Sequence, residues 1–524
     1  MSAPTAESPK AIGRYFERLM ELSPVEATYY GLHQHDHRLP DGSLAAAHER
    51  GKLLARLEAN LERTGDGLDH EIARFYARLS RFHHDELRLW ARMAEGPDVI
   101  GSAIFLLFSR DFAPLEDRLG AIAARMEAAP EYLRSSRERL TEPVRLWNQI
   151  AAETARQLPS LFEVVVAAAP QGTLRTRLER AAAGASAAAV EFAGWLEEDA
   201  VPRSTDEWAL GEERFARLLD LRRLPLGPEA VRDLGSRYLA EVKAEREQLL
   251  SRHWPGRSLE EVNDELRGRH PESFEAALDE YRETISRSRE FVAAHGLATL
   301  PRDEALRVEE TPGFLRPVIP FAAYEPPAFF DDHQLGIYIV TRQEGELGEH
   351  SQPSILNTSV HEGYPGHHLQ FASANRNRSL ARLLNAEHAT ELIEGWAHYC
   401  EQLMYEEGFS GGPEVRFVQL NDLVWRACRV IIDVELSCGR MGFEDAVRML
   451  TTEAAMTRQA AVAEVKRYTF TPGYQLSYLY GKHLLLELRE RRRSSEGTGF
   501  QLRRFHDTLL SASAVPAAMW DQLF

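Results

Sequence analysis

Apolar residues recur at intervals of three and four along much of this chain, and this spacing limits the folds open to it. The stretches 12–22, 115–129 and 274–294 follow the pattern closely. Such spacing places the apolar side chains on one face of an α-helix, and each such face needs a neighbour to cover it. The sequence therefore predicts a mainly α-helical protein built from many packed helices.

An alanine-rich run and two prolines refine this prediction. Residues 180–198 hold two large aromatic side chains among many small ones. This predicts a closely packed internal helix rather than a low-complexity segment, because small residues let a neighbour approach. Ser23-Pro24 and Ala129-Pro130 precede acidic residues, a pattern typical of the first turn of a helix.

Helical spacing disappears between about residues 301 and 360, where prolines cluster. Within this segment, LGIYIVT at residues 335–341 is short, rich in β-branched residues and flanked by polar ones. It therefore predicts a β-strand. We place a boundary near residue 310, between an N-terminal helical half (1–310) and a C-terminal catalytic half (311–524).

The composition argues against several classes of protein. Charged residues make up 27% and hydrophobic ones 44%, as in ordinary globular proteins. The formal charge of −18 argues against nucleic-acid binding, which needs clustered Lys and Arg. The absence of any run of about 18 apolar residues argues against a membrane helix, and the N-terminus lacks the apolar core of a signal peptide.

The cysteines favour a cytoplasmic protein. Cys400, Cys428 and Cys438 are the only three, and no two of them form a C-x-x-C pair. We expect reduced, mostly buried thiols. Nothing in the sequence predicts the oligomeric state.

Residues 360–370, VHEGYPGHHLQ, resemble a zinc motif with altered spacing. In H-E-x-x-H the histidines lie one helical turn apart and bind one zinc ion, while the glutamate activates water. Here His367 follows His361 by six positions and His368 follows it by seven. In a regular helix the first pair points about 120° apart and the second lies about 10.5 Å apart along the axis. Neither pair can hold one zinc ion without a distortion.

Pro365 and Gly366 could supply that distortion. Proline breaks helical hydrogen bonding and glycine tolerates unusual backbone angles. The two extra residues could therefore loop out and return His367 to the place of the second ligand, which predicts a bulge between Glu362 and His367. The alternative is an ordinary turn whose histidines are surface or capping residues.

Residues 389–407 offer a third zinc ligand at helical spacing. We favour Glu394, because Gly395 beside it would let another backbone approach and Trp396 indicates a packed face. Glu391 and His398 are the competitors. The remaining acidic residues of this segment we interpret as a solvated face: Glu401, Glu406 and Glu407.

Three segments carry a resemblance to a known family: HEGYPGHHLQ, EGWAHYCE and RYTFTPGYQLSYLYGK, the last at residues 467–482. Together with residues 21–41, they resemble the bacterial family known as domain of unknown function 885 over nearly the whole chain. That family is grouped with the gluzincin metallopeptidases, which include angiotensin-converting enzyme, neurolysin and the Taq-type carboxypeptidases.

The resemblance implies a large, mainly helical metallopeptidase-like fold with a deep cleft lined by the N-terminal half. It also implies a small β-sheet next to the zinc helix, and Zn²⁺ held by His361, His367 and Glu394. Where this chain has Ser437, similar proteins tend to have a histidine in a Gly-Leu-His context. Substrate preference therefore does not carry over from the resemblance.

The motif and the resemblance together suggest further roles. Glu362 would accept a proton from the attacking water and pass it to the leaving amine. Tyr478, and after it Tyr468, would stabilise the oxyanion, from a segment that also contains Tyr474 and Tyr480. The strand at 335–341 would be an edge strand that binds an extended peptide.

Three arginines follow the predicted site in the sequence: Arg426, Arg429 and Arg458. We interpret them as surface or salt-bridged residues, although one of them could bind a substrate carboxylate. The sequence as a whole predicts a zinc metallopeptidase of short peptides, either an oligopeptidase or a carboxypeptidase. The alternatives are a metal-dependent hydrolase of non-peptide amides or esters, and a helical binding protein without metal.

Overall fold

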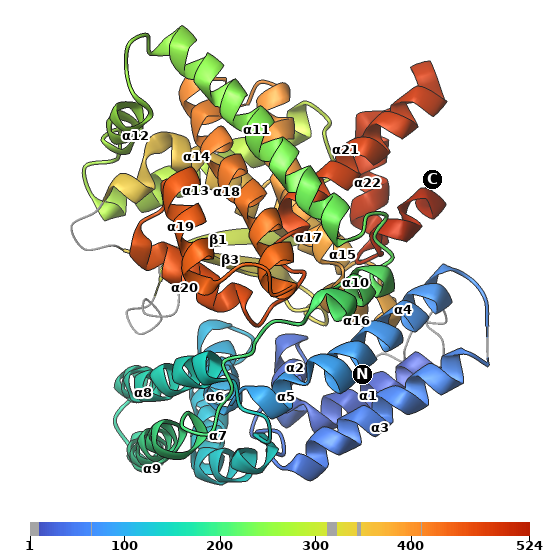
Figure 1. Ribbon diagram of the computed structural model, residues 1–524. Helices are drawn as coiled ribbons and strands as arrows, with labels where there is room; N and C mark the ends of the chain where they lie inside the picture. Colours follow the sequence, from blue (N-terminus) through green and yellow to red (C-terminus); the bar gives the residue numbers. More distant parts are fainter. Residues whose placement is uncertain (1–9, 64, 312–321, 343–346, 410) are drawn as a thin grey trace. The chain divides into compact units, whose positions relative to one another are not determined.

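The computed structural model describes residues 10–524 except 64, 312–321, 343–346 and 410 (Figure 1). It is mainly α-helical with one small sheet, as predicted. The chain divides into two compact units, Met1–Trp208 with Ala328–Phe330, and Ala209–Pro327 with Asp331–Phe524. The expected halves, 1–310 and 311–524, divide the chain by role rather than by packing, and that division stays a prediction, as does the deep cleft.

The first unit is built from helices. They are α1 (Lys10–Leu22), α2 (Pro24–Tyr29), α3 (Leu44–Leu61), α4 (Leu68–Phe82), α5 (Leu89–Arg92), α6 (Gly96–Ser109), α7 (Leu115–Ser136), α8 (Arg145–Ala168) and α9 (Thr173–Trp195). The alanine-rich helix α9 packs against α7 and α8. It buries Ala185, Ala189 and Phe192, which confirms the predicted close packing. Ala183, Ala187 and Val190 of the same helix are exposed, so the predicted internal position is wrong.

One predicted helix start is wrong. Helix α7 continues through Pro130 to Ser136 instead of ending before the proline. Proline removes a backbone N–H and costs an interior hydrogen bond. Here Met126 and Leu133, on either side of the proline, are both buried, and we attribute the continuity of the helix to this packing. The expected start at Pro24 is confirmed, since α2 begins there.

The second unit holds the remaining helices and the sheet. Its helices are α10 (Glu212–Leu221), α11 (Pro228–His253), α12 (Leu259–Arg267), α13 (Phe274–Ala294), α14 (Gln352–Glu362), α15 (His367–Ala374), α16 (Leu380–Asn385), α17 (Thr390–Glu406), α18 (Pro413–Ser437), α19 (Phe443–Glu453), α20 (Arg458–Tyr468), α21 (Ser477–Glu496) and α22 (Leu502–Ala512). Helices α14, α17 and α18 pack against one another in its interior.

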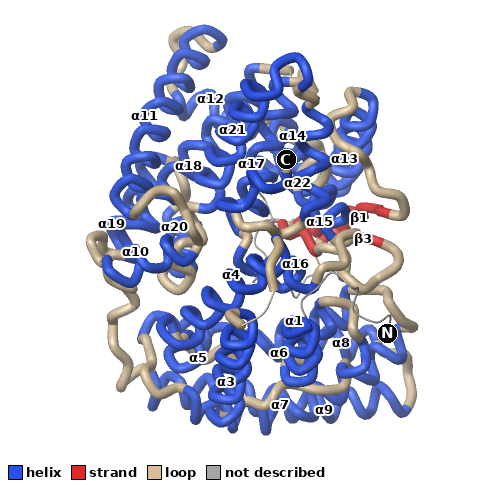
Figure 2. The backbone as a smooth tube through the Cα atoms, turned by 90° about the vertical axis from the view of Figure 1, so that its right-hand side faces the viewer, coloured by secondary structure: helices blue, strands red, loops and turns tan. Residues whose placement is uncertain are grey.

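The sheet contains three strands, β1 (Glu304–Glu310), β2 (Ala322–Glu325) and β3 (Gln334–Val340), in the order β1-β3-β2. Strand β3 confirms the predicted strand, but its predicted edge position is wrong. It pairs in parallel with β1 on one side and antiparallel with β2 on the other. Its run of buried residues from Gly336 to Val340 suits a central strand covered on both faces. Figure 2 shows the strands in red beside α15.

Helices α17 and α21 approach each other through glycines. A Cβ atom built on Gly395 would lie 2.5 Å from the carbonyl carbon of Gly481, and one built on Gly481 would lie 2.2 Å from the carbonyl oxygen of Glu391. Neither position has room for a larger side chain. The close backbone approach predicted at Gly395 is therefore confirmed, and it fixes the helix that carries Glu394.

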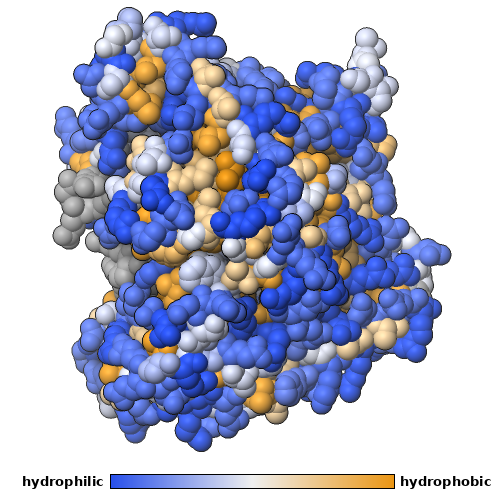
Figure 3. All heavy atoms as spheres, in the orientation of Figure 1, coloured by the Kyte–Doolittle hydropathy of each residue, from blue (hydrophilic) through white to orange (hydrophobic). Residues whose placement is uncertain are grey.

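Polar residues dominate the molecular face in Figure 3, with hydrophobic residues scattered among them. Within the described ranges, none of the helices combines the length and apolar character needed to cross a bilayer. Cys400 and Cys428 are buried and Cys438 is half-buried, as predicted. Burial raises the pKa of the Cys400 thiol, which disfavours its reactive thiolate form.

Candidate metal centre

The helix that carries His361 is interrupted where the sequence predicts a bulge. Helix α14 ends at Glu362 and α15 begins at His367, and the connection includes the cis Tyr364–Pro365 peptide bond. The Gly366 N–H donates to the Val360 carbonyl at 3.1 Å. A Cβ atom at Gly366 would lie 1.9 Å from the carbonyl oxygen of His361. The tight return of the chain thus requires glycine at this position.

A buried carboxylate ties the turn to the sheet. Glu304 of β1 accepts hydrogen bonds from the Tyr364 hydroxyl and from Arg289 Nε, the latter at 3.0 Å. On the other side, the Trp396 indole N–H donates to the Pro365 carbonyl at 2.8 Å. The turn is therefore held from both β1 and α17, independently of any bound ion.

His368 belongs to this anchor and lies outside the histidine cluster. Its Nε2 lies 2.7 Å from Glu304 and its Nδ1 lies 3.0 Å from the Tyr324 hydroxyl. Gly336 on β3 leaves room for the ring, since a Cβ there would lie 2.5 Å from Nδ1. Of the two adjacent histidines, only His367 faces His361.

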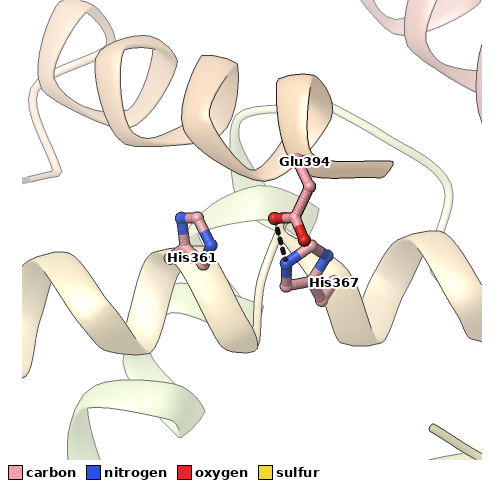
Figure 4. Close-up of side chains that lie close together, drawn as sticks. All are labelled: His361, His367 and Glu394. Atoms are coloured by element: carbon pink, nitrogen blue, oxygen red, sulfur yellow. Dashed lines mark ion pairs between the residues drawn. The ribbon is translucent and has the colours of Figure 1, made fainter. Parts of the chain in front are cut away.

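The interruption brings the three predicted ligands together (Figure 4). Among the described residues, His361, His367 and Glu394 form the one group of buried metal-ligand side chains, with one ligand atom from each within 4.8 Å of the others. His367 Nε2 and Glu394 Oε2 are 3.6 Å apart. The two imidazole rings lie 4.9 Å apart at an interplanar angle of 87°.

This donor set fits zinc. Two imidazoles and one carboxylate form a familiar set of three protein ligands in catalytic zinc sites. With bonds of about 2.1 Å, tetrahedral ligand atoms lie about 3.4 Å apart, close to the 3.6 Å between His367 and Glu394. The wider separations within the group need only small side-chain rotations. His361, His367 and Glu394 could therefore hold one Zn²⁺ ion.

Glu401 supports the cluster from behind, and its assignment to a solvated face is wrong. Its carboxylate lies 2.7 Å from Nδ1 of His361 and the residue is only 2% exposed. The contact orients the ring so that Nε2 remains for a metal, as expected of a carboxylate behind a histidine ligand. Glu401 lies seven residues after Glu394 and so shares its helix face. Glu406 and Glu407 are exposed, as predicted.

The charges of the site are coupled. Burial would raise the pKa of Glu394, but His367 and the Tyr474 hydroxyl outweigh it and hold the pKa at about 2. Burial would lower the pKa of His367, but the Glu394 and Glu362 carboxylates raise it instead. The pKa of Glu401 is held well below its usual range against burial, mainly by Arg426. Glu394 and Glu401 therefore stay ionised, and their negative charge favours a bound cation.

Glu362 lies beside the cluster without belonging to the ligand group. It is the last residue of α14, directly after His361, and it is half-buried. Its charge raises the pKa values of both His367 and the buried Tyr338 of β3. Glu362 therefore lies close enough to His367 for its charge to act on this ligand.

Tyr474, rather than the preferred Tyr478 or Tyr468, contacts the cluster. Its hydroxyl donates to the Glu394 carboxylate. The rings of Tyr474 and Tyr478 lie 6.0 Å apart, which places Tyr478 one side chain further out. The Tyr468 hydroxyl instead pairs with Glu464 at 2.6 Å and Arg429 at 2.8 Å. The oxyanion role assigned to Tyr478 and Tyr468 stays a prediction.

A buried network fixes the turn that presents Tyr474. Asp433 of α18 accepts the backbone N–H groups of Gly473 at 2.8 Å and Leu476 at 2.9 Å. Arg222 donates to the Gly473 carbonyl from the opposite side. Pro472 and Gly473 directly precede Tyr474 and are typical of a turn, but nothing in the spacing reveals which side chain this turn directs to Glu394.

The competing ligands lie elsewhere. Glu391 forms an ion pair with Arg222, and His398 lies behind the cluster, 3.4 Å from Glu401. The arginines follow their expected interpretation. Arg426 and Arg429 are buried, and they pair with Glu401 at 3.4 Å and with Glu464 at 2.8 Å, respectively. Arg458 is exposed and pairs with Glu444 at 2.9 Å.

Comparisons with known proteins identify relatives without a described activity. Residues 24–523 match the family described as bacterial protein of unknown function (DUF885). Similar solved structures include a candidate lipoprotein of unknown function from Shewanella oneidensis, at 22% identity and a TM-score of 0.79 over 98% of each chain. Another is a candidate lipoprotein from Colwellia psychrerythraea, at 19% identity and a TM-score of 0.86 over 98% of each chain. At these identities the likeness shows a shared fold, and no curated protein matches the chain.

Proposed function

We propose, for a chain that belongs to the bacterial DUF885 family, a zinc-dependent peptidase activity on short peptides. The observation that carries this proposal is the buried group of His361, His367 and Glu394, with ligand atoms within 4.8 Å of one another. The grouping with the gluzincin metallopeptidases that the family resemblance implies favours the same activity. A cytoplasmic location stays a prediction.

The residues around the cluster suit hydrolysis of an amide bond. Bound there, Zn²⁺ would supply a Lewis acid and lower the pKa of water from about 15.7 towards 7. Glu362, next to His361, would take the proton of the attacking water and deliver it to the leaving amine. The Tyr474 hydroxyl, which donates to Glu394 in the structure, would turn to donate a hydrogen bond to a developing oxyanion.

We assign zinc binding and proton transfer to different residues, so the two can be tested separately. Glu362→Gln keeps the size of the side chain and removes its basicity, while His361, His367 and Glu394 are untouched. We expect the variant to retain zinc and to lose about 100-fold or more of kcat, the range typical of a general base. Glu407→Gln, an exposed change at the end of α17, serves as the matched control.

Zinc-loaded protein would be incubated with a mixed pool of short peptides, and the products would be followed by mass spectrometry. Cleavage by the wild type and by Glu407→Gln, but not by Glu362→Gln, would support the proposal. Cleavage retained in Glu362→Gln would refute the role of this residue. A zinc-loaded wild type that cleaves no peptide would contradict peptidase action and favour a non-peptide amide or ester as substrate.

A further inference from the structure

Two arginines next to the metal centre share one carboxylate. Glu464 of α20 lies 2.8 Å from Arg429 and 2.9 Å from Arg467. The hydroxyl of Tyr468 also donates to Glu464. These contacts leave one positive charge without a paired negative charge in the group. A buried charge in excess is costly unless something compensates it.

Arg429 is held rigidly, with one end of its guanidinium available. Its guanidinium carbon lies 3.9 Å from the ring centre of Trp425 and 4.6 Å from that of Tyr478. Its Nε donates to Tyr468 and its Nη2 donates to Glu464. Within the described part of the chain, Nη1 has no hydrogen-bond partner. Because the side chain is already fixed, a ligand at Nη1 would pay little additional ordering entropy.

Arg429 is connected to the metal centre through two tyrosine side chains. Tyr474 contacts Glu394, and the ring of Tyr478 separates Tyr474 from Arg429. Burial raises the pKa of Tyr478 to about 12, and among the neighbouring charges Glu394 raises this pKa while Arg429 and Arg467 lower it. The side chains of Tyr474 and Tyr478 thus span the distance between Glu394 and Arg429. This distance is on the order of two to four residues of extended peptide.

We propose that Arg429, assisted by Arg467, binds a carboxylate of the substrate, and that this group is the C-terminal carboxylate of a short peptide. Guanidinium groups pair with carboxylates through charge-assisted and often bidentate hydrogen bonds. Binding there would compensate the excess positive charge and place a peptide bond near the chain end at the metal centre. The inference rests on the proposed peptidase function and narrows its substrates to peptides with a free C-terminus.

The test compares matched peptides with a free or an amidated C-terminus, each with and without a glutamate near that end. In the wild type we expect kcat/KM to favour the free acid by about 10-fold to 100-fold, as for a hydrogen bond to a charged group. Arg429→Lys keeps the positive charge but loses the planar guanidinium and its several N–H donors. Arg467→Gln removes the charge of the second, partly exposed arginine. Both should bring the acid-to-amide ratio close to one, mainly through KM. Arg458→Gln, whose side chain is 67% exposed, should keep the wild-type ratio.

The outcomes separate this inference from the proposed function. Equal cleavage of acid and amide by the wild type would overturn the inference and leave the peptidase intact. Cleavage of the amidated glutamate peptide as fast as the free acid would overturn the C-terminal assignment. If no peptide is cleaved, the proposed function fails. Calorimetric binding of the free acid and the amide to Glu362→Gln then still tests the arginine site, and equal affinity would overturn it.

Because Arg429 is buried, its variant could also fail by misfolding. The unfolding midpoint and circular dichroism of Arg429→Lys therefore need to match those of the wild type before its kinetics are interpreted. Arg467→Gln keeps the test decisive if they do not match, because its side chain is 36% exposed. An acid-to-amide ratio that is unchanged in a folded Arg467→Gln and a folded Arg429→Lys would refute the site.

Discussion

Replacing Gly366 with alanine tests whether the break between α14 and α15 creates the metal centre. A Cβ atom at this position would lie 1.9 Å from the His361 carbonyl oxygen and 2.4 Å from that of Val360, whereas real Cβ contacts are almost never under 3.0 Å. Both obstructing atoms belong to the backbone of α14, so no side-chain rotation relieves the clash. The end of the helix that carries His361 has to move.

The size of the effect follows from these distances. Overpacking commonly costs about 1–3 kcal/mol, and a clash with two backbone atoms places Gly366→Ala at or above the upper end, about 3 kcal/mol. A functional site tolerates displacements of about 0.5 Å, which is less than the shift that the His361 carbonyl needs. We therefore expect zinc affinity to fall at least about tenfold, the lower limit for loss of a supporting contact.

The unfolding midpoint in denaturant and competition for zinc with a fluorescent chelator would measure both effects. Gly499→Ala is the matched control, since Gly499 is exposed and a Cβ there meets nothing within 4 Å. We expect the control to change stability by less than about 0.5 kcal/mol. If Gly366→Ala has the same unfolding midpoint and the same zinc affinity as the wild type, the role assigned to the turn is refuted.

Three further changes probe the surroundings of the cluster. Glu401→Gln removes the carboxylate 2.7 Å from His361 and should lower zinc affinity about 10-fold to 100-fold in the same competition assay; an affinity equal to that of Glu407→Gln would contradict this. Tyr474→Phe should retain zinc and lower kcat on a cleaved peptide about 100-fold, with a smaller loss in Tyr478→Phe; the reverse order would favour Tyr478. Burial raises the pKa of Glu464, but Arg429 and Arg467 hold it at about 2, below the usual 4.5. Its stabilising contribution, about 3 kcal/mol, is thus present above pH 4.5 and is lost as the pH falls towards 2. Unfolding curves between pH 5 and pH 2.5 should show this loss in the wild type and a smaller one in Glu464→Gln.

The helical architecture could be predicted because the spacing of apolar residues within each helix indicates which face is buried. The stretches 12–22 and 274–294 fall within α1 and α13, since apolar spacing depends only on neighbouring residues. Pro130 shows the limit of this reasoning. Its local pattern predicts a new helix start, whereas α7 continues through the proline between buried residues that the local pattern does not weigh.

Strand β3 shows the same limit at the level of the sheet. Its residues predict a strand, but its position in the sheet depends on β1 and β2, which are separate in sequence. Their pairing needs non-local contacts that no local pattern encodes. The continuous apolar run of β3 is the one sequence signal for a central strand. This signal argues against the predicted edge position.

The three ligands of the cluster could be predicted from the sequence, whereas the residues that support them, Glu401 and Tyr474, could not. The spacing of His361 and His367 demands a distortion, and Pro365-Gly366 identifies where it lies. The sequence predicts that Glu401 is solvated, because acidic residues on a helix usually face water, but the residue is buried. Its distance of two helical turns from Glu394 is a signal that could have revealed it. The choice of Tyr474 over Tyr478 depends on how Asp433 and Arg222 hold a turn, which is tertiary information.

Zinc content is the most direct test of the proposed metal centre. After loading with zinc and removal of free metal, elemental analysis of the wild type should find about one zinc ion per chain. His367→Ala should lose this zinc, while His368→Gln should keep it, because His368 lies against Glu304 and Tyr324. A wild type that retains no zinc, or zinc retained in His367→Ala and lost in His368→Gln, would contradict the assignment of the site.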